Sequence, residues 1–129
     1  MQPNACVFPG GKIDDADFSD EWRDLFSQHL DWQEFLQSIP KSCSPRCHCY
    51  CKARQSSIPA DVGLRICAIR ETFEESGVLL LRDASQLISL QMDTSFGNVG
   101  KAHTLPSLQL SHWRKQVHEN AFNFLALCR

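Results

Sequence analysis

One amphipathic segment, residues 59–77, constrains this chain more than any other part of its sequence. Its apolar side chains recur at helical spacing and form one narrow stripe, which consists of Val62, Ile66, Ile69 and Phe73. Pro59 suits a first helical turn, Ser57 is a candidate N-cap, and Gly77 suits a left-handed C-terminal cap. The pattern predicts a helix over 59–76 whose stripe packs on a core.

Three carboxylates gather on the face of this helix opposite the stripe. Glu71, Glu74 and Glu75, the carboxylate cluster, follow i, i+3, i+4 spacing in the last turns. They repel one another, and the helix dipole disfavours anions at this end. A hard divalent cation such as Mg²⁺ would turn both effects favourable, and Arg70 could orient a neighbouring carboxylate. The alternative is a solvated acidic helix face, which is common at protein surfaces.

Outside this helix the sequence predicts shorter elements joined by polar stretches. We expect a strand over 5–8, a helix over 20–37, a loop over 40–57, a buried strand over 78–81, a loop over 82–110, and a last helix that Ser111 caps, with Trp113, Val117, Phe124 and Cys128 on its core side. The apolar stripe over 22–36 favours core packing over a partner or membrane surface. His103, His112 and His118 are isolated, which is typical of surface or packing residues.

Length and composition indicate a single domain over residues 1–129, with an ordinary apolar content of 43%. A formal net charge of −2 provides no basic footprint for nucleic acid, which we therefore exclude as a partner. The longest apolar stretch is far too short to span a bilayer. Because the first residues lack the charged and apolar regions of a secretory signal, we expect an intracellular protein.

Two separated motifs resemble the Nudix box, G-x5-E-x7-R-E-U-x-E-E-x-G-U, in which U is aliphatic. The run 70–78, RETFEESGV, matches the second half except that Thr72 stands at an aliphatic position. Gly11 and Asp17 match the first half, with Asp in place of Glu. In the box seven residues separate these two positions, whereas here 52 residues separate Asp17 from Arg70. About 45 residues are therefore inserted, over about 18–57. Such a split box is similar to the peroxisomal coenzyme A diphosphatases of the Nudix family.

The resemblance implies an α/β fold, namely a partial Nudix α/β/α sandwich with a large, partly helical insertion inside the box. It also implies hydrolysis of the diphosphate of coenzyme A or acyl-coenzyme A to 3′,5′-ADP and (acyl-)4′-phosphopantetheine. Arg70, Glu71, Glu74 and Glu75 would be catalytic, and the three glutamates would bind Mg²⁺ or Mn²⁺. Asp17 would be an auxiliary carboxylate with a shorter reach than the usual Glu.

A further resemblance concerns the substrate. The run 8–14, FPGGKID, is similar to the FPGGxxD end of the signature that coenzyme A Nudix hydrolases carry. The resemblance implies that Phe8, Gly10, Gly11 and Asp14 contribute to substrate binding.

Much of the Nudix sheet would lie before the FPGG turn and after the box, so we expect a truncated domain. The alternative function is therefore a catalytically inactive Nudix protein that acts as a metal-binding or regulatory fragment. The resemblance implies a peroxisomal address, but residues 127–129 are not a Ser-Lys-Leu signal.

A cysteine-rich run offers a competing metal site. Cys43, Cys47, Cys49 and Cys51, with His48 between them, could bind Zn²⁺ in a tetrahedral site. The Cys-x-Cys-x-Cys spacing crowds the ligands, whereas structural zinc sites use more widely separated pairs. The spacing favours a reduced cysteine-rich loop within the insertion.

Overall fold

A computed structural model describes residues 11–39, 56–81, 102–103 and 105–129. In chain order the elements are the 3₁₀ helix η1 (Asp15–Phe18), α1 (Glu21–Ser27), α2 (Trp32–Ser38), α4 (Ala60–Ser76), β1 (Leu79–Leu80), β2 (Ala102–His103), α6 (Ser107–Glu119) and α7 (Phe122–Cys128). The predicted strand over 5–8 and the cysteine-rich run lie outside the described residues. Within the described part of the chain, none of the helices is both long and apolar enough to cross a membrane.

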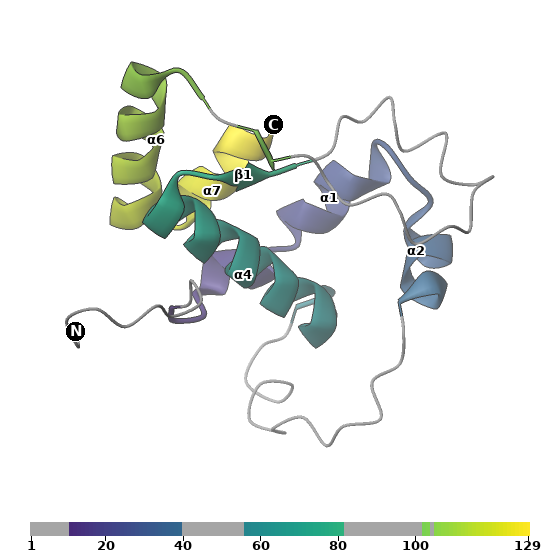
Figure 1. Ribbon diagram of the computed structural model, residues 1–129. Helices are drawn as coiled ribbons and strands as arrows, with labels where there is room; N and C mark the ends of the chain where they lie inside the picture. The colour runs from purple at the N-terminus through teal and green to yellow at the C-terminus, as the bar shows by residue number, and fades with distance from the viewer. Residues whose placement is uncertain (1–10, 40–55, 82–101, 104) are drawn as a thin grey trace.

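Helix α4 is the central element of the described structure, and the other helices surround it (Figure 1). The sequence predicts its course and its buried stripe correctly: Val62, Ile66 and Phe73 are buried, and Ile69 is half-buried. Its C-terminal cap, Gly77, has a φ of 74°, the left-handed conformation that glycine adopts without a steric penalty.

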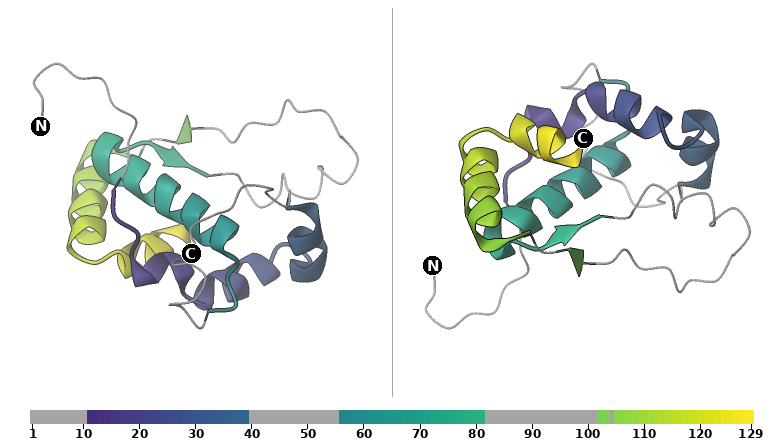
Figure 2. Two further views of the ribbon diagram at one scale, coloured as in Figure 1. Left: turned by 90° about the horizontal axis from the view of Figure 1, so that it is seen from below. Right: turned by 90° about the horizontal axis from the view of Figure 1, so that it is seen from above.

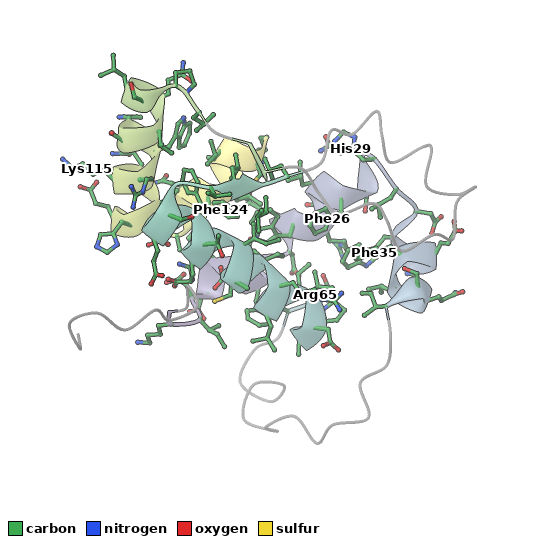
Figure 3. All side chains as sticks on the ribbon, viewed as in Figure 1. Phe26, His29, Phe35, Arg65, Lys115 and Phe124 are labelled. Atoms are coloured by element: carbon green, nitrogen blue, oxygen red, sulfur yellow. The ribbon has the colours of Figure 1, made fainter. Side chains whose placement is uncertain are left out.

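The partners of the stripe differ from the prediction. Side chains of three helices cover it, and they are Trp22 of α1, Val117 of α6, and Phe124 and Leu125 of α7. Phe124 lies between α4 and α1 in Figure 3, with its ring centroid 6.0 Å from Phe73 and 6.1 Å from Trp22. Aromatic pairs at such distances stabilise a core beyond the area that they bury. Helices therefore replace the expected sheet as the main cover of α4 in the described residues.

The sheet of the described residues is small. Strands β1 and β2 pair antiparallel, with Leu79 opposite His103 and Leu80 opposite Ala102. The buried strand expected over 78–81 is confirmed as a strand in its central two residues, but only Leu79 is buried and Leu80 is 40% exposed. Strand β2 falls in a stretch expected to be loop. The described elements are mostly helical, so they do not confirm the expected α/β/α sandwich.

The single helix expected over 20–37 is wrong, because the chain forms α1 and α2 with a break between them. The break follows from Asp31, whose extended backbone and carboxylate cap α2 by accepting a hydrogen bond from the Glu34 N–H at 2.8 Å. The chain turns between the two short helices, and the rings of Phe26 and Phe35 lie 6.2 Å apart (Figure 3). The apolar spacing thus continues across a turn.

The last helix is also two helices. Helix α6 begins at Ser107, directly after Pro106, and not at Ser111, so its first turn falls in the expected loop. It ends at Glu119, and the extended backbone of its C-cap Asn120 turns the chain. The Asn120 side chain accepts a hydrogen bond from the Phe122 N–H at 3.0 Å. Val117 and Phe124 are buried as expected, but they belong to separate helices.

Ser57 does not cap α4, contrary to the sequence prediction, because Pro59 occupies the N-cap position. Instead, the Ser57 N–H and hydroxyl donate to the Asp20 carboxylate at 2.9 and 2.7 Å. These hydrogen bonds lower the pKa of Asp20 from its ordinary value. The pair thereby joins the start of α1 to the segment that leads into α4.

Candidate active site

Arg70, in the fourth turn of α4, is the centre of the candidate site. Its guanidinium donates to both oxygens of Asp17, from Nε at 2.8 Å and from Nη2 at 3.0 Å. Nη1 donates to Glu71 Oε1 at 2.9 Å and to Glu74 Oε1 at 2.6 Å, and Nη2 also donates to the Lys12 carbonyl at 3.0 Å. One planar group therefore joins the N-terminal segment to two members of the carboxylate cluster.

The charges of this network are buried and mutually paired. Arg70 is 4% exposed and Asp17 is 1% exposed. Burial alone would lower the pKa of Arg70, but hydrogen bonding to Asp17, the charge of Asp17 and the hydrogen bond to Glu74 outweigh it and raise that pKa. Among the described residues, every buried side-chain nitrogen or oxygen has a hydrogen-bond partner. The network is therefore satisfied as it stands, and Arg70 carries a permanent charge.

Asp17 is positioned by the short helix η1. The Asp14 carboxylate accepts from the Ala16 N–H at 2.9 Å, and the Asp17 carboxylate accepts from the Asp14 N–H at 2.9 Å. This reciprocal arrangement is a capping box, which fixes the first turn of a helix. Trp22 continues the chain of contacts by donating from its indole to the Ala16 carbonyl at 2.8 Å. Asp17 thus anchors Arg70 from within the fold.

Gly11 lies directly against the carboxylate of Glu71. A Cβ atom at this position would collide with Glu71 Oε1 and Oε2, so a glycine is required for this approach. The first and second halves of the split motif are therefore side by side at two points, Gly11 with Glu71 and Asp17 with Arg70. The long intervening segment does not separate them in space.

Two residues that the sequence does not single out reach the cluster from α6. Arg114 donates to the Glu74 carbonyl from Nε at 3.0 Å and from Nη2 at 2.7 Å, and to the Glu75 carbonyl from Nη2 at 2.8 Å. His118, expected as a surface or packing residue, is exposed, and its Nδ1 lies 3.3 Å from Glu74 Oε2. From the sequence, a divalent cation is expected to offset the negative charge at this helix end, and Arg114 and Arg70 supply part of that positive charge. Only the crossing of α6 over α4 reveals them.

The carboxylate cluster fits a divalent cation in its donor chemistry. Carboxylate oxygens are the ligands that Mg²⁺ and Mn²⁺ prefer, and Arg70 orients two of the three glutamates. Glu75 is exposed, and the side chains of Glu71 and Glu74 are mostly buried. In the part of the chain that the structure describes, no three His, Cys, Asp or Glu side chains are already grouped closely enough to hold an ion. The fit is one of ligand type and of a shared helix face.

The expected substrate-binding residues are placed only in part. Phe8 and Gly10 lie outside the described residues. Gly11 and Asp14 are exposed, and the Asp14 side chain caps η1. The nearby thiol of Cys67 is buried, and burial together with the charge of Asp17 raises its pKa to about 11, so it is not a nucleophile at neutral pH.

Comparisons with known proteins place the chain in a family. The NUDT19 Nudix domain family matches residues 1–129. The chain is 35% identical over 137 residues to the acyl-coenzyme A diphosphatase NUDT19 of Xenopus laevis, covering 100% of this chain and 33% of that protein. It is 36% identical to the proteins of the same name from Gallus gallus, over 132 residues, and Homo sapiens, over 135 residues. These matches cover 100% and 99% of this chain, and 34% of each relative.

The chain thus spans about a third of the length of these curated relatives. No solved structure matches it. The family match covers the whole chain, and the two halves of the split motif meet in space at Gly11 with Glu71 and at Asp17 with Arg70. On these grounds the chain belongs to the NUDT19 Nudix domain family.

Proposed function

We propose that this chain carries the catalytic motif of a metal-dependent Nudix hydrolase that cleaves the diphosphate of coenzyme A and acyl-coenzyme A. The products would be 3′,5′-ADP and (acyl-)4′-phosphopantetheine. The relatives at 35–36% identity are named acyl-coenzyme A diphosphatases, which supports this substrate class. Mg²⁺ or Mn²⁺ would be bound by Glu71, Glu74 and Glu75.

One observation carries the proposal: the network around Arg70 joins both halves of the split motif. Asp17 and Arg70 are separated by 53 positions in the sequence, yet they form a bidentate ion pair inside the fold. A solvated acidic helix face would not need a buried arginine that orients two of its carboxylates. The arrangement is therefore better explained by a functional cluster than by surface charge.

The chain's own residues would act mainly by positioning. Arg70 fixes one oxygen each of Glu71 and Glu74 and so limits the rotation of both side chains. Gly11 allows the N-terminal segment to approach Glu71 closely, which places backbone near the cluster. A bound divalent cation would supply neutralisation of diphosphate oxygens and a lowered pKa for an attacking water. Glu75, the exposed member of the cluster, lies where a substrate can reach it.

Hydrolysis of coenzyme A by the purified chain tests the proposal. We expect release of 3′,5′-ADP in about millimolar Mg²⁺, a concentration suited to weak sites that keep several waters. Glu75→Gln removes one charge with almost no change in size, and we expect it to abolish the release. Glu119→Gln is the matched control, because Glu119 is an exposed glutamate on α6 that contacts Lys115 and Gln116.

The outcomes separate the two functions. Release that is lost in Glu75→Gln and retained in Glu119→Gln supports the hydrolase. A chain that melts cooperatively but releases no 3′,5′-ADP, with or without Mn²⁺, would instead favour a non-catalytic metal-binding or regulatory role. Electron paramagnetic resonance measures the binding of Mn²⁺ directly and then decides whether the cluster binds metal at all.

A further inference from the structure

Helix α6 crosses the C-terminal end of α4, and the two helices lie side by side there in every view (Figures 1 and 2). The contact is close, because a Cβ atom on Gly77 would lie 3.2 Å from both terminal methyl carbons of Leu110. One turn further along α6, Arg114 places its guanidinium over the end of α4. It is half-buried and makes three hydrogen bonds of 2.7–3.0 Å there.

These hydrogen bonds address a general requirement of helix ends. The last four carbonyl groups of a helix have no intrahelical partner and must find other donors. In α4 the Gly77 N–H satisfies the Phe73 carbonyl at 2.8 Å, and Arg114 satisfies the carbonyls of Glu74 and Glu75. Arg114 therefore fixes the backbone of the very turn that carries two of the three cluster glutamates. Its positive charge also suits the negative end of the helix dipole.

We propose that Arg114 is a positioning residue for cation binding by the carboxylate cluster. This inference rests on the proposed function, and it adds a residue outside the sequence motif to the site. Arg114 contacts the backbone of Glu74 and Glu75, so it would influence a bound cation only through these two residues. It acts at the backbone while Arg70 acts at the side chains, so that the last turn of α4 is fixed from two directions.

An effect of the Arg114 charge and a positioning effect of Arg114 predict opposite changes in the affinity for a cation. If Arg114 acted only through its charge, removing it would strengthen the binding of a cation, because like charges repel. If Arg114 positions the last turn, removing it weakens binding, because the freed turn must be ordered when the cation binds. The direction of the change in affinity therefore distinguishes the two effects.

The test is the affinity of the full chain for Mn²⁺, measured by electron paramagnetic resonance without substrate. We expect Arg114→Ala to raise the Kd by about tenfold or more, a typical effect of removing a group that orients metal ligands. Arg114→Lys keeps the charge but loses the planar fork, so we expect an intermediate Kd. Lys115→Ala is the matched control: it removes the neighbouring charge of α6, which lies on the outer side of the helix in Figure 3 and is 76% exposed.

Each result bears on one hypothesis. Unchanged or tighter Mn²⁺ binding in Arg114→Ala would overturn the inference while leaving the proposed function intact, and so would equal weakening by Lys115→Ala. An unmodified chain that binds no Mn²⁺ would overturn the proposed function, and the inference with it. If Arg114→Ala does not melt cooperatively, Arg114→Lys takes its place, and a Kd equal to that of the unmodified chain then overturns the inference.

Discussion

Arg70 is the side chain on which the contacts of the site converge, and its partners explain why an arginine is needed there. Two of its nitrogens bind Asp17 in the fork geometry, and the remaining donors reach Glu71, Glu74 and the Lys12 carbonyl. A lysine has one charged nitrogen on a flexible stem and could not satisfy these acceptors together. Arg70 is thus both a structural link and the orienting group of the cluster.

We predict that Arg70→Ala destabilises the fold by about 3–5 kcal/mol, the usual cost of breaking a buried ion pair from one side. The physical cause is Asp17, which would remain buried at 1% exposure without its counter-ion. Urea unfolding measures the loss. Arg65→Ala is the control, because Arg65 is an exposed arginine of the same helix, labelled in Figure 3, and should cost less than about 0.5 kcal/mol. Equal losses in both variants would contradict the prediction.

A substitution at Gly11 tests the site without removing a charge. In Gly11→Ala the new methyl group would collide with the Glu71 carboxylate and displace it from Arg70. We expect Mn²⁺ affinity to fall by about tenfold. Asp17 and Glu74 still pair with Arg70 in this variant, so we expect the chain to keep its fold and to melt cooperatively.

The matched control is Lys12→Ala. Lys12 contributes its backbone carbonyl to Arg70, and that carbonyl remains when the side chain is shortened. Unchanged metal affinity in Gly11→Ala would show that the contact with Glu71 is not needed for binding.

At the scale of the element, α4 depends on how its C-terminal end is closed. Gly77 combines a left-handed backbone with close contact to Leu110 of α6. We predict that Gly77→Ala lowers the free energy of unfolding by about 1–2 kcal/mol, because a residue with a Cβ atom is strained in the left-handed conformation. Thermal unfolding measures this loss. Crowding against Leu110 adds to this cost.

Gly77→Asn separates the backbone effect from the crowding. Asparagine adopts the left-handed conformation more readily than alanine, so Gly77→Asn should lose less stability if the backbone dominates. If Gly77→Asn loses more than Gly77→Ala, crowding against α6 is the larger effect, because asparagine is the bulkier residue.

At the scale of the whole molecule, Phe124 joins the C-terminal helix to the rest of the core. It is 2% exposed and contacts Phe73 of α4 and Trp22 of α1. We predict that Phe124→Ala costs about 3–5 kcal/mol in urea unfolding, because the cavity lies where three helices meet. Phe122→Ala is the matched control in the same helix, since Phe122 is 44% exposed. A similar cost for both would show that α7 is not part of the core.

The sequence by itself determined the properties of α4. Its limits, its buried stripe, its Gly77 cap and the face that carries the carboxylates all follow from spacings of three and four residues, which are local. The same argument was less successful for the first and last helices, where Asp31 and Asn120 interrupt an apolar pattern that continues on the far side of a turn. Apolar periodicity indicates which side chains share a core, but not whether those side chains lie on one helix or on two.

Only the tertiary structure decided what surrounds that helix. Asp17 and Arg70 are 53 positions apart, and Arg114 is 40 positions from the Glu74 carbonyl that it binds. No local spacing encodes such pairs, because they depend on where separate segments cross. The same holds for the cover of the stripe: the resemblance implies a sheet, whereas in the described residues the helices α1, α6 and α7 supply most of the cover and Leu79 of β1 adds to it. The sequence identified the groups that carry the chemistry, and the packing of distant helices determined which groups orient them.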